Sequence, residues 1–188
     1  MAGLRAGLGL IGRRQHEKPG FRLYGAAVAV ARDPFFYRDL GVADTLDGRF
    51  DVLALHVFLL IRRLRALPLP GTAIAQAVFD AMFSDMDLNL REMGVGDLAV
   101  GKRVRAMWEA LHGRASAYES AMRAAETDAL TAALARNVWR GAAPDGAAAR
   151  LALLVRAQDA HLAAQSDALL SGQAVFLPAA AATRQPST

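Results

Sequence analysis

The sequence lacks cysteine and long apolar runs. Without thiols there can be no disulfide, no zinc–thiolate site and no cysteine nucleophile, and the chain suits a reducing compartment. The longest apolar run, residues 52–61, has ten residues with a histidine inside, whereas a membrane span needs about 20. The start, MAGLRAGLGLIGRR, has an early arginine and several glycines. We therefore expect neither a membrane helix nor a secretory signal.

The body of the chain also lacks net charge. The formal charge of +4 lies in residues 1–22, which carry five basic groups and one acidic group, while residues 23–188 carry 17 of each sign. A dedicated nucleic-acid binder needs a broad basic field, so we expect no DNA binding. The sequence instead predicts a flexible basic arm over residues 1–20, for which a ribosome and a membrane surface are alternative partners.

Runs of β-branched residues are few, and alanine and leucine dominate the 188 residues, which favours helices. We predict an all-α fold, a single-domain irregular bundle of six or seven helices over residues 21–172, followed by a disordered tail over 173–188. The expected boundaries are a first helix from Phe21 to Ala31, caps at Asp33, Asp44 or Thr45, Thr72 and Asp97, an interruption at Gly113, helix ends at Gly94 and Gly141, and a last helix opened by Pro144.

Two of these helices carry more apolar surface than a small domain requires. Residues 52–61 are apolar on nearly every side and are followed by three arginines, at positions 62, 63 and 65. Residues 72–93 place phenylalanines and methionines, including Met86 and Met93, on one stripe about 100° wide. Methionine-rich surfaces adapt to varied partners. The surplus is either core or a groove that holds an apolar helix of another protein.

The stretch GDLAVGKR, residues 96–103, resembles a phosphate-binding loop but lacks its determinants. A helix precedes it where a strand is needed, and Arg103 stands where a serine or threonine would ligate magnesium. We interpret it as a turn in which Asp97 caps the next helix, so that Asp97→Ala should cost about 1 kcal/mol. An alternative is that Asp97 contacts a partner, as the basic cluster of Lys102, Arg103 and Arg105 could.

No other pattern indicates catalysis, a cofactor or a metal. DMDLN, residues 85–89, begins like a calcium loop but lacks the glycine and the final glutamate. The four histidines are scattered, and His56 within its apolar run is interpreted as a core histidine rather than a ligand or base. We therefore predict a protein that is not an enzyme.

Four segments within residues 50–140 together resemble the ubiquinol–cytochrome c chaperone family, in its bacterial branch. They are LALHVFLLIRRL (53–64), AQAVFDAMFSDMDLNLREMGVGDLAVGKRVRAM (75–107), ALHGRASAYESAM (110–122) and DALTAALARNVW (128–139). The mitochondrial members are assembly factors that act with a small partner protein near the ribosomal exit tunnel and bind newly made cytochrome b.

The resemblance implies a non-catalytic chaperone, cytoplasmic or peripheral at the inner membrane of a bacterium, with the mitochondrial matrix as the alternative. Its client would be cytochrome b or another apolar subunit of the ubiquinol–cytochrome c reductase, complex III. The alternative function is a ribosome- or RNA-contacting module acting on nascent membrane proteins. The candidate partner-binding residues, from the family's regular motif, the methionine stripe and the basic cluster, are Met86, Arg91, Glu92, Met93, Asp97, Lys102, Arg103, Arg105, Tyr118, Arg136 and Asn137.

Overall fold

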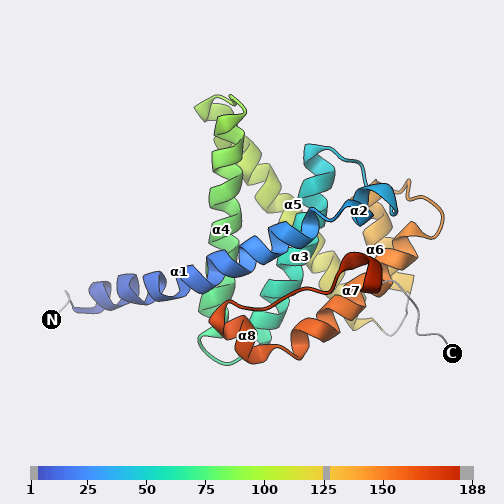
Figure 1. The fold of residues 1–188 in the computed structure, drawn as a ribbon. Coiled ribbons are helices and arrows are strands. Elements are labelled where there is room, and N and C mark those ends of the chain that lie inside the picture. Colours follow the sequence, from blue (N-terminus) through green and yellow to red (C-terminus); the bar gives the residue numbers. More distant parts are fainter. Residues whose placement is uncertain (1–3, 125–127, 183–188) are drawn as a thin grey trace.

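The protein's computed structural model describes residues 4–124 and 128–182 (Figure 1). Their helices are α1 (Leu4–Ala31), α2 (Pro34–Arg38), α3 (Leu46–Ala66), α4 (Gly71–Glu92), α5 (Asp97–Arg123), α6 (Asp128–Trp139), α7 (Ala147–Ala163), α8 (Ser166–Ser171) and α9 (Ala179–Ala182). Within these ranges there is no strand, and the predicted all-α class is confirmed. The last predicted helix is two helices in the structure, because α7 ends at Ala163 and α8 begins at Ser166.

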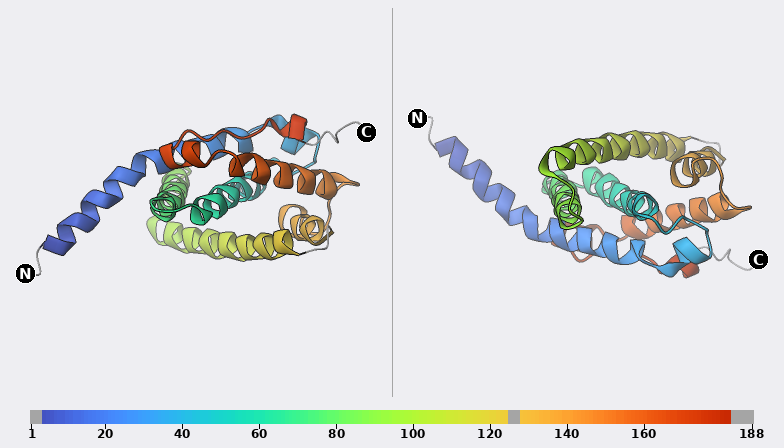
Figure 2. Two further views of the ribbon diagram at one scale, coloured as in Figure 1. Left: turned by 90° about the horizontal axis from the view of Figure 1, so that it is seen from below. Right: turned by 90° about the horizontal axis from the view of Figure 1, so that it is seen from above.

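Helix α3 forms the centre of the bundle. Figure 2 shows it enclosed, with α1 and α7 on one side and α5 on the other. Twelve of its 21 residues are buried, and Val57, Leu59, Leu60 and Leu64 have no exposed surface. A helix without a polar face must bury its apolar surface on all sides to remove it from water. Most of the apolar surplus in residues 52–61 is therefore core.

Local signals define several helix ends as predicted. The Thr45 hydroxyl accepts a hydrogen bond from the Gly48 amide at 3.2 Å, and Asp33 accepts one from the Phe35 amide at 3.0 Å. Gly94 ends α4 with φ +77°, in the left-handed region that glycine adopts without strain. The cap predicted at Thr72 is wrong, because α4 begins one residue earlier, at Gly71, without a capping side chain.

Helix α1 begins at Leu4, so the start predicted at Phe21 is wrong. The helix crosses α4 at Gly20, where an added Cβ would lie 2.5 Å from the Cβ of Ala77. A turn later the Tyr24 hydroxyl donates a hydrogen bond of 2.6 Å to Asp85. Flexibility of the arm stays a prediction, and its residues 1–3 lie outside the described residues.

Helix α5 continues through Gly113, so the predicted interruption is wrong. A glycine inside a helix costs about 1 kcal/mol relative to alanine. Here Leu111 and Tyr118 are buried on either side of it, and their packing offsets that cost.

Disorder of the tail, residues 173–188, stays a prediction; in the structure its first part is bound by two glutamine side chains. The Gln158 side chain donates to the carbonyl of Leu177 at 2.7 Å and accepts from its amide at 2.9 Å. Gln165 makes the same pair of bonds with Val175. Each glutamine amide donates to and accepts from one residue of the extended segment, as the backbone of a neighbouring strand would. The small residues of this part of the sequence do not indicate such binding. Residues 183–188 lie outside the described residues.

Candidate functional site

The near-miss phosphate loop is the turn between α4 and α5. It follows a helix, not a strand, and its residues 97–103 form about the first two turns of α5. Gly96, in an extended conformation, is the N-cap of α5. The geometry of a phosphate loop, a glycine-rich turn after a strand, is therefore not what this stretch forms.

Asp97 is the first residue of α5 and not its cap, so that prediction is wrong. Because Gly96 already takes the cap position, the Asp97 side chain lies outside the helix end and is 87% exposed. It pairs with Arg91, which also bonds Asp87 at 2.7 Å. Hydrogen bonding to Asp87, and then to Asp97, raises the pKa of the Arg91 guanidinium. This ion-pair chain fastens α4 to the start of α5 on the surface.

The remaining candidate residues do not form one site. Near the turn, Glu92, Lys102, Arg103 and Arg105 are exposed, and Arg105 pairs with Glu109 at 3.0 Å. Tyr118 lies about 30 Å along α5 from Asp97, at 1.5 Å of rise per residue, and is 1% exposed. Arg136 and Asn137 lie on α6. The family motif therefore marks two regions of the molecule.

Around Tyr118 the structure places a buried charge cluster that sequence reasoning missed. Asp51, on α3 and fully buried, pairs with Arg114 of α5 at 2.7 Å and with Arg140 after α6. Burial raises the pKa of Asp51, although both guanidiniums act in the opposite direction. Burial also raises the pKa of Tyr118, whose ring packs against Phe58 at 5.7 Å. The cluster joins α3, α5 and the end of α6, which gives Tyr118 a structural environment.

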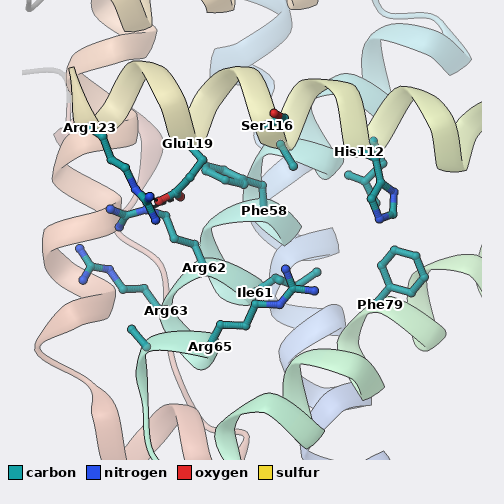
Figure 3. A pocket seen from close by; sticks show the side chains of 13 residues that line it. Phe58, Ile61, Arg62, Arg63, Arg65, Phe79, His112, Ser116, Glu119 and Arg123 are labelled. Carbon is teal, nitrogen blue, oxygen red and sulfur yellow. Dashed lines mark hydrogen bonds and ion pairs between the residues drawn. The ribbon is translucent and has the colours of Figure 1, made fainter.

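An open groove runs between the second halves of α3 and α5, beside the first half of α4. Its volume is about 610 Å³. Apolar side chains from all three helices form its floor: Phe58, Ile61, Phe79, Leu111 and Ala115. We call this cavity the α3–α5 groove; Figure 3 shows Phe79 and His112 at one end of it and Arg63 and Arg123 at the other.

The basic end of the α3–α5 groove is held by shared ion pairs. Arg62 contacts Glu119 at 2.9 Å and Asp159 at 2.7 Å. Arg63 also bonds Asp159, and Arg123 bonds Glu119 at 2.7 Å. The side chains of Arg62 and Arg63 are only 23% and 24% exposed. The three arginines that follow the apolar run in the sequence therefore stand at the margin of a groove.

A smaller cleft of about 200 Å³ opens between the first half of α3 and the tip of the α4–α5 hairpin. Met86, Met93 and Met107 line it together with Leu53 and Phe50. Met86 is 9% exposed and Met93 is 54% exposed. The predicted methionine stripe thus faces partly into the core and partly into an open cleft, which we call the methionine cleft.

The imidazole of His56 is in the core, as predicted. It is 0% exposed, its Nδ1 donates to the carbonyl of Val52 at 2.8 Å, and its ring lies between Phe36 and Phe176. Burial lowers the pKa of His56 to about 4. The ring is therefore neutral at neutral pH and packs as an apolar side chain.

The described ranges, 4–124 and 128–182, contain no group of three His, Cys, Asp or Glu side chains placed to hold a metal ion. In the same ranges, none of the helices combines the length and apolarity that crossing a bilayer requires. What the site offers is an apolar concavity with a positively charged end.

Comparison with known proteins identifies related chains. The family model described as ubiquinol-cytochrome C chaperone matches residues 38–176. The crystal structure of the Cbp3 homolog from Brucella abortus is similar, with 34% sequence identity and a TM-score of 0.79; the match covers 92% of this chain and 97% of that one. None of the curated proteins matches. The family match contains all the residues that line the α3–α5 groove and begins at the last residue of α2.

Proposed function

Since this chain belongs to the ubiquinol–cytochrome c chaperone family, whose role is in complex III assembly, we propose that it is a non-catalytic chaperone whose client is cytochrome b. The client would bind through an apolar segment in the α3–α5 groove, with the methionine cleft as an adaptable neighbouring surface. The protein would hold that segment away from water until its place in complex III is available. We place this work in the cytoplasm or at the cytoplasmic face of the inner membrane.

The observation that carries the proposal is the groove itself. A small soluble bundle usually closes its core, yet here a cavity of about 610 Å³ with a phenylalanine-rich floor stays open between α3 and α5. Open apolar concavities of this size bind ligands or partner side chains. An assembly factor needs such a surface, because its clients are apolar before they are assembled.

The fitting partner is a helix. Membrane proteins such as cytochrome b consist of apolar helices, and an apolar helix docks in a groove by side chains spaced three and four residues apart. Flexible methionines line the neighbouring cleft, and their unbranched side chains adjust to different client surfaces.

A chromosomal deletion complemented with groove variants tests the proposal. Ala115 forms part of the groove floor and is half-buried, so Ala115→Trp would fill the groove. We expect assembled complex III to fall severalfold with Ala115→Trp. The matched control is Ala149→Trp, at an exposed position on α7, which should restore assembly.

The readout is complex III on native gels and cytochrome b by its reduced-minus-oxidised spectrum. Both tryptophan variants are first checked for an unchanged melting temperature. Normal complex III in the deletion strain would refute the proposal.

A second function, contact with ribosomes, is favoured by α1. The N-terminal half of α1 extends beyond the other helices in Figures 1 and 2, and residues 1–22 hold five basic side chains against one acidic one. Co-sedimentation with ribosomes should then weaken steeply as salt rises. Absence of co-sedimentation at low salt would remove this function and leave the first intact.

A further inference from the structure

The α3–α5 groove has the length and the spacing of a helix-binding site. On α5 lining residues recur at steps of four from Leu111 to Arg123, and on α3 Phe58, Ile61 and Arg65 follow one another at steps of three and four. These steps keep the side chains on one face of each helix. The α5 wall is about 18 Å long at 1.5 Å per residue, which equals about three turns of a helix laid beside it.

The two ends of the α3–α5 groove differ in chemistry. At one end Phe79 lies against the His112 ring, 5.7 Å between centroids, and His112 in turn stacks on Trp108. At the other end stand Arg62, Arg63 and Arg123, and in Figure 3 the Arg65 side chain extends from the same side toward Ile61 and the middle of the groove. An occupant that fits both ends is apolar along its length and charged at one end.

The charge of that basic end is unbalanced. Glu119 and Asp159 are shared among Arg62, Arg63 and Arg123. For Arg65, no ion pair is present among residues 4–124 and 128–182. Four guanidiniums against two carboxylates leave an excess of two positive charges beside an apolar floor.

The position of these arginines allows their excess positive charge to attract an anionic partner. Arg65 and Arg123 lie in the last turns of α3 and α5, where cations also stabilise the helix ends. Arg65 and Arg123 can therefore stabilise their own helices, but this interaction with the helix ends does not neutralise the excess positive charge of the groove. Because Arg62 and Arg63 are partly withdrawn from water, a carboxylate that reaches this end is attracted more strongly than it would be on an open surface.

We propose that the α3–α5 groove takes an apolar helical segment of a protein partner that carries carboxylates at one end, where they pair with Arg65 and the neighbouring arginines. This inference rests on the proposed function for the groove's role and adds the chemistry of the segment that is selected. The unpaired Arg65 is the first contact, and Glu119 can yield Arg123 to the incoming carboxylate.

The test uses the full chain and labelled synthetic peptides in fluorescence anisotropy. Each peptide is an alanine–leucine helix of about four turns. One carries two glutamates in its first turn, another carries them in its last turn, and each has a twin with glutamines in their place. We expect at least one glutamate peptide to bind about three- to tenfold more tightly than its twin, with a preference that shrinks as salt rises.

Variants assign the preference to the groove. Arg65→Gln should remove most of it and Arg65→Glu should reverse it, while Arg38→Gln, which alters an exposed arginine of α2 outside the groove, should leave it unchanged. Circular dichroism confirms that each variant is folded. Equal binding of the glutamate and glutamine peptides, or a preference that survives Arg65→Glu, would overturn the inference.

A competition with decanoate separates a peptide site from a site for anionic amphiphiles. Displacement of the glutamate peptide only at concentrations where decanoate forms micelles supports the inference. Tight decanoate binding together with no peptide binding would overturn it.

If charge preference is absent and Ala115→Trp still blocks complex III assembly, the inference fails and the proposed function stands. A deletion strain with normal complex III would instead refute the function, whatever the peptides do.

Discussion

At the scale of single residues, the core includes two fully buried polar side chains of α3, His56 and Asp51. His56 could be assigned to the core because its neighbours in sequence are apolar on every side. The partners of Asp51 could not, because Arg114 and Arg140 lie 63 and 89 positions away and no local spacing connects them. Asp97 looked like a cap from composition alone, yet the neighbouring glycine occupies that position.

His56 gives the protein a pH dependence of stability with a defined sign. Its pKa is about 4 in the folded chain against an ordinary 6.5, so the unfolded chain binds a proton more readily. The stabilisation is complete above pH 6.5 and is lost as the pH falls toward 4. Between about pH 7.5 and about pH 5, we expect a loss of about 2 kcal/mol in the free energy of unfolding from this group.

Urea unfolding at several pH values, followed by circular dichroism, measures this loss. His56→Leu should flatten the acid limb by that amount, whatever its effect at neutral pH. Parallel profiles for His56→Leu and wild type would contradict the assignment.

At the scale of elements, helices were predictable where caps and periodicity agree. The cap at Thr45 and the end at Gly94 follow from local chemistry, which the sequence contains in full. The continuity of α5 through Gly113 and the bound segment 173–182 depend on packing with distant elements. Those contacts are tertiary, and local propensity cannot reveal them.

Alanine substitutions at two glycines of α1 distinguish the effect of packing on stability from the effect of helix propensity. Gly20→Ala would place a Cβ 2.5 Å from that of Ala77 and 2.8 Å from its backbone, so α1 must shift from α4. We expect a cost of about 1–3 kcal/mol, typical of overpacking. Gly25→Ala meets nothing within 4 Å and should stabilise the protein by up to about 1 kcal/mol through helix propensity. Thermal unfolding of both variants is the measurement, and shifts of the same sign would contradict a close crossing at Gly20.

At the scale of the whole molecule, the sequence left open whether the surplus apolar surface is core or groove. In the structure part of it is core and part of it lines open cavities. The apolar helix α3 is core on most sides, but its contact with α5 is incomplete and leaves the α3–α5 groove. The methionine cleft opens mainly among α1, α3 and α4. Composition predicted the surplus of apolar surface. The path of α5 determines which part of the apolar surface of α3 is left uncovered. This path depends on the buried Asp51 cluster and the ion pairs of Arg62.

The candidate residues divide in the same way. The exposed motif members surround the α4–α5 turn, Tyr118 belongs to the core, and Arg136 lies on α6. The groove that best fits a client was represented in the sequence only by the arginines that follow residue 61 and by the phenylalanines of α4. Its third wall, on α5, lies largely within residues 110–122, which resemble the family but carry no pattern that indicates a groove.

The central claim is that the α3–α5 groove holds a complex III subunit, and in-cell photo-crosslinking tests it most directly. A benzophenone amino acid replaces Ser116, an exposed residue of the groove, and in a parallel strain replaces Ala149 on the exposed face of α7. The account predicts an adduct with cytochrome b from position 116 and none from position 149. Absence of any complex III subunit among the adducts at 116, or equal adducts from both positions, would contradict it.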